Sequence, residues 1–420
     1  MRRQPRPVPD VDRTTPALVL KLDANVFHHG GLGVIRSLGG LGVPVYAVQE
    51  ERLTPAGSSR YLRGGWVWRP GTDDAERLLA GLRRIGERIG TRAVLLPTDD
   101  AGAMFVAEYQ SKLRETFLFP EVDPALPRLV ADKYALHDVC RRAGLPCPAR
   151  TLARSPDEAD EFPVVVKLVH PWRGSGRARS TTLVRDRDEL ARLFADAAGD
   201  ELLLQEYLPG EDWFFHGYCD ERSRCRPAFT GRKHRSYPAD AGLTAFGTAR
   251  PNPALAASAQ QLFEHLSYRG IMDLDVRLDP RDGQYKLLDF NPRLGAQFRL
   301  FADDAGVDVA VAAHLHLTGR EIPRGEPVRR GFLVENYDPL AAFGYWRRGR
   351  LGPGAWLRSL REVDELAWFA CDDLRPFGLM CARLAWRAVR KQFPGRARPP
   401  VASPRYRPGR ATPEGETDDR

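Results

Sequence analysis

The sequence predicts an N-terminal α/β domain followed by a larger α+β region, and three observations support this prediction. Over residues 17–97, short apolar runs that suit buried strands alternate with helical segments, which is typical of a parallel sheet covered by helices on both faces. Over residues 202–290, strand candidates follow one another with turn signals between them. The chain has 420 residues, and single cores stop growing at roughly 250–300 residues, so two or three domains are expected.

The N-terminal domain is expected over residues 16–125. Its helix candidates are the segment from the turn at His29–Gly33 to Leu41, and Thr72–Ile89. Its strand candidates are Ala17–Leu22, Val43–Val48 and Ala93–Pro97.

The second region begins with a helical segment, Lys133–Ala143, which ends at Gly144. Asp282-Gly283 is a strong turn signal between two strands, and it predicts a tight hairpin of Ile271–Leu278 with Tyr285–Phe290. A helix is expected over Val307–Thr318, and a helical C-terminal extension over residues 321–393. The other strand candidates are Phe162–Val169, Leu202–Leu208, Trp213–Tyr218 and Arg226–Gly231, the last two antiparallel.

Charge and composition exclude several classes of protein. The net charge is +8, of which residues 1–13 carry +2 and residues 387–420 carry +5. Charge at the chain ends does not make the basic face that DNA binding needs. Residues 1–15 and the Pro- and Arg-rich residues 394–420 are expected to be disordered. We expect no secretory leader, because no apolar stretch follows the charges of the N-terminal segment, and the sequence contains no apolar run long enough to span a membrane. The six cysteines lack metal-ligand spacing, so a cytoplasmic protein is expected.

Acidic and amide side chains gather in the predicted hairpin. Side chains alternate along a strand, so Asp289 and Asn291 share one face, and Asp275 on the partner strand can reach it. These oxygen ligands suit Mg²⁺, which also takes phosphate oxygens; an ordinary strand end is the alternative. Arg293 follows and is placed to meet an anion beside the metal. Asp273 is either a further ligand or a surface residue of its strand.

Several cations are candidates for phosphate binding. Lys167 lies within a β-branched run, where a buried charge is costly unless paired. Lys133 follows Asp132 near a helix start, where the helix dipole disfavours a cation, so it is either a phosphate ligand or a plain surface lysine. Lys233 and Arg235 belong to a cationic cluster that could equally be a solvated loop. Residues 173–177 form a glycine-containing loop that either cradles phosphate through its N–H groups or is a plain hairpin turn.

The segment Gln205–Asp212 runs from a predicted buried strand through Pro209-Gly210 into acids. Main-chain groups exposed there can pair with an adenine. An acid can hold ribose hydroxyls.

In this order along the chain, these features resemble the ATP-grasp superfamily, and most closely its carboxylate–amine ligases of the D-aspartate ligase-like group. The resemblance covers about residues 17–320. It implies an N-terminal Rossmann-like (pre-ATP-grasp) domain over residues 16–125 and an ATP-grasp domain over residues 126–320. The small lobe would span about residues 150–208, and the large lobe would hold the metal site.

The resemblance also implies an activity: ATP activates a carboxylate as an acylphosphate, an amine displaces phosphate, and ADP and phosphate are released. Gln205 and Asp289 depart from the family pattern, because many relatives carry Glu at both positions. The shorter Asp289 could alter how two metal ions are bridged. The resemblance implies that ATP is bound by Lys133, Lys167, Gln205, Glu206, Leu208 and Asp212. It implies that Mg²⁺, with Mn²⁺ as an alternative, is bound by Asp275, Asp289 and Asn291. The catalytic residues that it implies are Arg293, Lys233 and Arg235.

Three other functions stay open at the level of sequence. The chain could be an ATP-binding regulatory protein without turnover. It could be a Rossmann-type oxidoreductase, on the strength of Gly31 and Gly33, although Arg36 replaces the third glycine of that fingerprint. The basic segment 381–393 could bind anionic lipid. We expect small-molecule carboxylate and amine substrates, no nucleic acid and no stable membrane insertion. An oligomer is compatible with the sequence, and the acid and amine are not identified by it.

Overall fold

The structure is a computed structural model that describes residues 8–68, 75–168, 181–197, 202–239 and 242–392. The chain forms two compact units. The first unit comprises residues 1–125, 293–326 and 367–420, and the second comprises residues 126–292 and 327–366. The first unit therefore includes residues 293–326 and 367–420, which were expected to belong to the later domains. Residues 8–15, expected to be disordered, are described, and Val11 among them is buried. Residues 1–7 and 393–420 lie outside the described residues.

The first unit contains a five-stranded sheet in the order β3-β2-β1-β4-β5, in which every pair is parallel. Its strands are β1 (Ala17–Leu20), β2 (Val45–Gln49), β3 (Leu62–Val67), β4 (Ala93–Pro97) and β5 (Phe117–Leu118). Its helices are α1 (Gly30–Gly40), α2 (Ala75–Ile89), α3 (Asp100–Glu108), α4 (Gln110–Leu113), α9 (Val309–Leu317) and α12 (Arg375–Gln392), with 3-10 turns η1 (Ala56–Ser58) and η3 (Phe298–Leu300).

Helices cover both faces of this sheet because β1 is apolar throughout. Leu18 and Leu20 join a core that includes residues of α2 and α3. Val19 points to the other face, where a Cβ placed on Gly31 of α1 would lie 3.5 Å from its Cγ1. All four residues of β1 are buried. The predicted parallel sheet with helices on both faces is confirmed. The two glycines of β3 explain why its sequence was not recognised as a strand, since glycine is depleted in strands.

Arg36 has a structural role in the first unit. This residue replaces the third glycine of a dinucleotide fingerprint, and its side chain is buried. Its Nε lies 3.0 Å from Asp373 Oδ2, and its Nη2 donates to the carbonyl of Trp368 at 2.7 Å. Arg36 thus ties the segment before α12 to α1.

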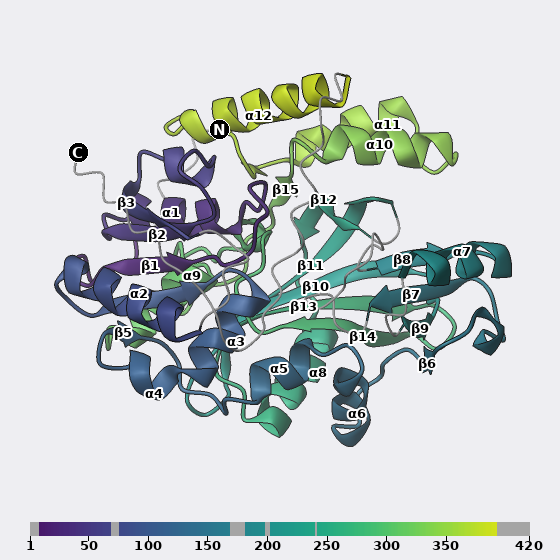
Figure 1. The fold of residues 1–420 in the computed structure, drawn as a ribbon, viewed down its shortest axis with the longest axis horizontal. Coiled ribbons are helices and arrows are strands. Elements are labelled where there is room, and N and C mark those ends of the chain that lie inside the picture. The colour runs from purple at the N-terminus through teal and green to yellow at the C-terminus, as the bar shows by residue number, and fades with distance from the viewer. Residues whose placement is uncertain (1–7, 69–74, 169–180, 198–201, 240–241, 393–420) are drawn as a thin grey trace. The chain divides into compact units, whose positions relative to one another are not determined.

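The second unit contains a seven-stranded sheet and a four-stranded sheet. The larger has the order β14-β13-β10-β11-β12-β15-β16 and is antiparallel apart from the β15–β16 pair; Figure 1 shows β10, β11 and β13 side by side. Its strands are β10 (Glu211–Cys219), β11 (Cys225–Tyr237), β12 (Leu243–Ala249), β13 (Gly270–Asp279), β14 (Gln284–Asn291), β15 (Gly331–Leu333) and β16 (Glu365–Leu366).

The smaller sheet has the order β6-β9-β7-β8 and is antiparallel. Its strands are β6 (Arg150–Ala153), β7 (Val164–Leu168), β8 (Thr181–Val184) and β9 (Leu202–Glu206). The helices of the second unit are α5 (Leu126–Ala131), α6 (Ala135–Arg142), α7 (Arg187–Ala197), α8 (Pro253–Leu266), α10 (Asp338–Arg347) and α11 (Pro353–Ser359), with 3-10 turns η2 (Pro156–Glu158) and η4 (Leu360–Glu362).

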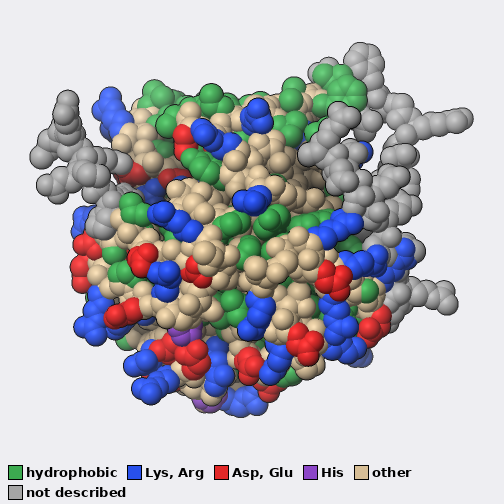
Figure 2. All heavy atoms as spheres, turned by 90° about the vertical axis from the view of Figure 1, so that its left-hand side faces the viewer, with side chains coloured by type: hydrophobic (Ala, Val, Ile, Leu, Met, Phe, Trp, Pro, Cys, Tyr) green, Lys and Arg blue, Asp and Glu red, His purple; other side chains and the backbone are tan. Residues whose placement is uncertain are grey.

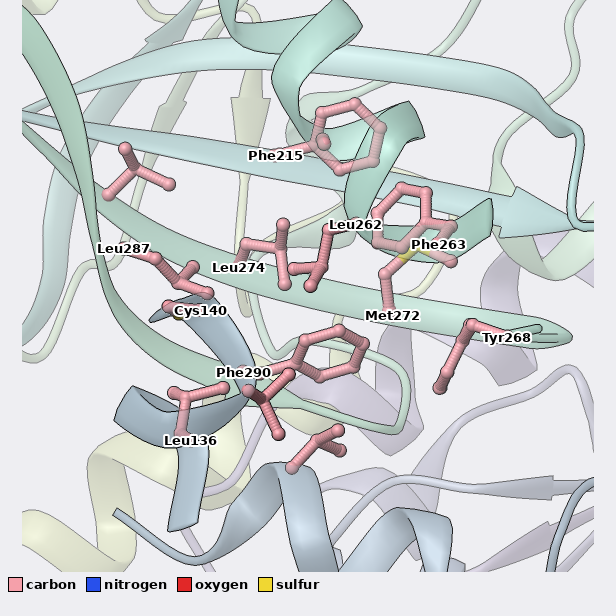
Figure 3. Packing of buried hydrophobic residues seen from close by; sticks show 14 of the residues in the cluster. Leu136, Cys140, Phe215, Leu262, Phe263, Tyr268, Met272, Leu274, Leu287 and Phe290 are labelled. Carbon is pink, nitrogen blue, oxygen red and sulfur yellow. The ribbon is translucent and has the colours of Figure 1, made fainter. Parts of the chain in front are cut away.

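The main core of the second unit lies on one face of the β13–β14 hairpin. Leu274 of β13 and Phe290 of β14 pack there with Leu262 and Phe263 of α8 (Figure 3). Because side chains alternate along a strand, the residues on either side of Leu274 and Phe290 point away from this core. The apolar face of the hairpin therefore determines which face carries its acids.

Charges of both signs share the surface. On the face shown in Figure 2, Lys and Arg side chains are interspersed with Asp and Glu side chains. In the described part of the chain, no helix has both the length and the apolar character needed to cross a bilayer.

Candidate active site

The β13–β14 hairpin aligns the predicted metal ligands in pairs. Asp275 lies opposite Asp289, and Asp273 lies opposite Asn291. The register shifts between Asp275 and Val276, which leaves Leu288 as the extra residue of a bulge. This bulge matters for the site, because the carbonyl of Leu288 accepts a hydrogen bond from Lys167 Nζ at 3.0 Å.

Eight of the twelve predicted site residues line one pocket in the second unit. The other four predicted residues, which are not in that lining, are Lys133, Arg235, Asn291 and Arg293. The eight in the lining are Lys167, Gln205, Glu206, Leu208, Asp212, Lys233, Asp275 and Asp289.

Three lysines, from the turn between α5 and α6, from β7 and from β11, pair with the two carboxylates. Asp289 Oδ1 accepts from Lys133 Nζ at 2.6 Å and from Lys167 Nζ at 3.0 Å. Asp275 Oδ1 accepts from Lys233 Nζ at 2.8 Å. The side chain of Lys167 is 4% exposed, as expected for a lysine in a buried strand. Lys133, which is outside the pocket lining, thus reaches the site through Asp289.

The pKa values follow from burial and from these charges. Burial alone would raise the pKa of Asp289, but Lys133 and Lys167 hold it well below its usual range. Burial raises the pKa of Asp275, and the carboxylates of Asp273 and Asp289 raise it further against the opposing effect of Lys233.

The two pocket lysines shift in opposite directions. Burial lowers the pKa of Lys167, although Asp289 opposes this shift. Burial would also lower the pKa of Lys233, but Asp275 and Asp212 raise it to about 12. Lys233 therefore keeps its charge at neutral pH, while Lys167 is the lysine whose charge depends on its partner.

Asn291 lies at the end of the hairpin beside Asp273. Its Nδ2 donates to the carbonyl of Asp273 at 3.2 Å. The carboxylate of Asp273 lies 3.0 Å from Nε2 of His216, whose side chain is fully buried. The sequence left open whether Asp273 is a metal ligand or a surface residue. In the structure, Asp273 and His216 form a buried polar pair next to the site.

The segment predicted to hold adenosine is organised by Arg277. Arg277 Nε donates to Asp212 Oδ1 at 2.6 Å, and its Nη1 donates to the carbonyl of Leu208 at 3.0 Å. The backbone N–H of Glu206 is bonded to the carbonyl of Ala149 at 2.8 Å. Arg277 was not predicted as a site residue, although alternation along β13 places it on the same face as Asp275. Thr181 of β8 also lines the pocket and was not predicted, because no sequence pattern marks it.

Two predicted catalytic residues have other partners. Arg235 lies beyond a bulge in β11, and its Nε donates to Asp338 Oδ1 at 2.6 Å. Arg293 belongs to the first unit, where its Nε lies 3.2 Å from Asp100 Oδ1. The glycine-containing loop at residues 173–177 lies outside the described residues.

The chain is similar to known proteins in sequence and in fold. No protein-family model matches the chain. A D-aspartate ligase of Enterococcus faecium is 25% identical over 306 residues, which cover 66% of this chain and 71% of the relative. The crystal structure of an L-amino acid ligase from Bacillus licheniformis superposes with a TM-score of 0.58 at 14% identity, covering 76% of this chain and 79% of that one.

The chain has the ATP-grasp fold. A further structure with this similarity is the biotin carboxylase domain of a Hydrogenobacter thermophilus 2-oxoglutarate carboxylase, in complex with MgADP, ADP and bicarbonate. It has a TM-score of 0.52 and 16% identity, and the match covers 74% of this chain and 71% of that one. The predicted ATP-grasp fold and the predicted resemblance to carboxylate–amine ligases are confirmed.

The donor set of this ATP-grasp chain fits Mg²⁺. The described residues contain no group of three or more His, Cys, Asp or Glu side chains arranged to hold a metal. The candidate set instead combines two carboxylates and one amide at neighbouring positions of a hairpin. That set suits Mg²⁺, which is usually bound by one or two carboxylates together with water and substrate phosphates. The pKa of Asp275 is raised mainly by burial and further by the carboxylates of Asp273 and Asp289, and a bound divalent cation would stabilise its charged form.

Proposed function

We propose that the chain is an ATP- and Mg²⁺-dependent ligase that activates a carboxylate as an acylphosphate and couples it to an amine, with release of ADP and phosphate. One observation carries this proposal. Lys133 of the turn between α5 and α6, Lys167 of β7 and Lys233 of β11 converge on the carboxylates of Asp289 and Asp275. The same groups can bind a triphosphate and its cation together, because the lysines match phosphate oxygens and the carboxylates match the metal.

The residues divide into roles by their chemistry. Asp275, Asp289 and Asn291 would hold Mg²⁺, which when bound neutralises charge on the phosphates. Lys133, Lys167 and Lys233 would then turn from the carboxylates to phosphate oxygens, whose charge offsets the cost of burying Lys167. Mn²⁺ can take the same oxygen ligands.

The adenosine moiety is assigned to the segment from Gln205 to Asp212. Gln205 is 7% exposed and lines the pocket. Arg277 holds the carboxylate of Asp212 in place, so that its second oxygen can meet the ribose hydroxyls. Glu206 and Leu208 would contact the adenine through their main chain.

The reaction requires two displacements. An oxygen of the substrate carboxylate attacks the γ-phosphorus, the bond from the γ-phosphorus to the bridging oxygen of ADP breaks, and an acylphosphate forms. The nitrogen of a neutral amine then attacks the acyl carbon, phosphate leaves with the C–O electron pair, and the amine loses a proton to solvent or to phosphate. We assign to Arg293 the stabilisation of the oxyanion that develops at the acyl carbon. Water must be excluded while the acylphosphate exists, because it would hydrolyse the intermediate.

Amino acids are the first substrates to test, because the relatives described above are named as D-aspartate and L-amino acid ligases. We place the enzyme in the cytoplasm, where ATP is available; all six cysteines are free thiols, which agrees with a reducing compartment. We expect no nucleic-acid partner, because most of the net charge of +8 lies at the chain ends rather than on a basic face of a folded unit.

The test is amine-dependent release of ADP from ATP and Mg²⁺, with D- and L-amino acids supplied pairwise as carboxylate and amine. Lys167→Met is expected to abolish the release. The matched control, Asp157→Asn, removes a charge in the same unit from an ion pair that is 83% exposed at Asp157 and is expected to keep full activity. Full activity in Lys167→Met would refute the site assignment. ADP binding without turnover for any pair would favour a regulatory ATP-binding protein instead.

A further inference from the structure

The second unit contains another pocket, which shares no lining residue with the candidate active site. Its volume is about 320 Å³. Strand β11, strand β12 and the segment from α10 to η4 all contribute to its wall. We propose that this pocket binds a small carboxylate that carries an aromatic ring. This proposal is independent of the proposed ligase activity.

A bulge in β11 separates the two pockets. Lys233 pairs with Gly247 of β12, but Arg235 pairs with the next residue, Phe246. Regular alternation would place Lys233 and Arg235 on the same face, since they are two residues apart. The extra residue, His234, turns Arg235 away from the active site, so that Lys233 lines one pocket and Arg235 the other.

Hydrogen bonds fix the side chain of Arg235 at the second pocket, and one nitrogen of its guanidinium has no partner among the described residues. The residue is 4% exposed. Its Nε donates to Asp338 Oδ1 at 2.6 Å, and its Nη1 donates to Ser359 Oγ at 3.0 Å. Its Nη2 is buried and has no hydrogen-bond partner among the described residues. A buried donor without an acceptor is unfavourable. Arg235 lines the pocket, so a carboxylate oxygen that displaces the atoms covering Nη2 would supply that acceptor.

The supports of Arg235 keep its guanidinium in one orientation. Trp356 Nε1 donates to the other oxygen of Asp338 at 2.8 Å. The guanidinium carbon of Arg235 lies 4.4 Å from the ring centre of Phe246. A guanidinium that is stacked on a ring and held by a carboxylate loses little further freedom when a ligand binds.

Flat aromatic surfaces form much of the remaining wall. The guanidinium carbon of Arg350 lies 5.0 Å from the ring centre of Tyr345. The rings of His234 and Phe246 lie 5.3 Å apart with an angle of 30° between their planes. Such surfaces suit a planar apolar group, which can stack on either a ring or a guanidinium.

The charges of the wall favour a monoanion. Burial, together with the charges of Arg232, Arg235 and Arg250, lowers the pKa of His234 to about 4, so this ring is neutral at pH 7 and lies in a positive potential. Glu362 also lines the pocket, and its carboxylate would repel a ligand with several negative charges. Asp338 already compensates the charge of Arg235, and Glu362 opposes that of Arg350, so the pocket accommodates a single carboxylate rather than a nucleotide or phosphate.

The test uses benzoate as the probe and benzamide as its neutral counterpart, in calorimetric titrations of the full chain. A ligand of this size is expected to bind with a Kd on the order of 1 mM, and benzamide at least about tenfold more weakly. Arg350→Gln is expected to weaken benzoate binding about tenfold. The matched control, Arg347→Gln, changes an exposed arginine of α10 that does not line the pocket and should leave binding unchanged.

Two further titrations separate this pocket from the active site. Saturating MgADP and the substitution Arg293→Gln are both expected to leave benzoate binding unchanged. No benzoate binding, equal binding of benzoate and benzamide, or loss of binding with MgADP or in Arg293→Gln rather than in Arg350→Gln would each overturn the proposal. None of these outcomes bears on ADP release, so the two proposals can fail separately.

Discussion

Replacement of Asp289 by Asn is expected to destabilise the nucleotide-free protein, and a second substitution is expected to reverse most of the loss. Asp289 Oδ1 is 3.0 Å from Lys167 Nζ and 2.6 Å from Lys133 Nζ. Lys167 is 4% exposed, so loss of the carboxylate leaves its charge buried beside the Leu288 carbonyl. Removal of one partner from a buried pair costs about 3–5 kcal/mol. Lys133 is 18% exposed and retains some hydration. We therefore expect Asp289→Asn to lower the free energy of unfolding by about 3 kcal/mol in total.

Lys167→Met removes the other member of the Lys167–Asp289 pair. This substitution is expected to lower the free energy of unfolding by about 1 kcal/mol or less. Asp289 keeps its ion pair with Lys133, and the methionine side chain fills a volume similar to that of lysine without a buried charge. In the double variant the unpaired ammonium is gone, so it should be more stable than Asp289→Asn by about 2 kcal/mol.

The assay is urea unfolding followed by tryptophan fluorescence. Because the chain has two units, the transition compared is the one that ADP shifts to higher urea concentration. Asp157→Asn is the control, because its pair with Arg187 is 83% exposed at Asp157 and 51% at Arg187, and it should change stability by about 0.5 kcal/mol or less. Equal stability of Asp289→Asn and Asp157→Asn, or no recovery in the double variant, would refute the assignment of Asp289 as the partner that compensates the buried charge of Lys167.

Three further predictions concern the metal, pH and a turn. Asp275→Asn should raise the Mg²⁺ concentration needed for half-maximal ADP release about tenfold or more, while Asp157→Asn leaves it unchanged; an unaltered Mg²⁺ requirement would remove Asp275 from the ligand set. Because burial lowers the pKa of Lys167, ADP affinity should fall as pH rises through that pKa. Because the pKa of Asp275 is raised, Mg²⁺ affinity should fall as pH drops through it. Calorimetry between about pH 4 and 10, a range bounded by the ordinary pKa values of Asp and Lys, tests both directions, and flat profiles would contradict them. Gly210 has φ of 122°, and a Cβ there would lie 2.1 Å from the carbonyl oxygen of Leu278, so Gly210→Ala should lower the free energy of unfolding by about 2 kcal/mol or more. Gly344→Ala, in α10 with no atom within 4 Å of a new Cβ, should raise it by about 0.5–1 kcal/mol; the same sign of change in both variants would contradict the argument.

Local sequence patterns determined a large part of the fold and of the candidate site. Alternation and the Asp282-Gly283 turn predicted the β13–β14 hairpin, in which Asp275 lies opposite Asp289. The same alternation places Arg277 beside them, although it was not recognised. These features follow from sequence because the two-residue repeat of a strand and the conformation of a short turn depend only on neighbouring residues.

The tertiary structure decided which distant groups meet. Lys167 is 122 residues from Asp289 in sequence, and no local pattern specifies that pairing. The β11 bulge, which places Lys233 and Arg235 in different pockets, depends on the register with β12 and on the Asp338 carboxylate of α10. Residues 293–326 return to the first unit although the sequence pattern of the ATP-grasp region continues to residue 320. Such choices depend on which strands become neighbours and which charges are buried together, and these are properties of the whole packed chain rather than of any one segment.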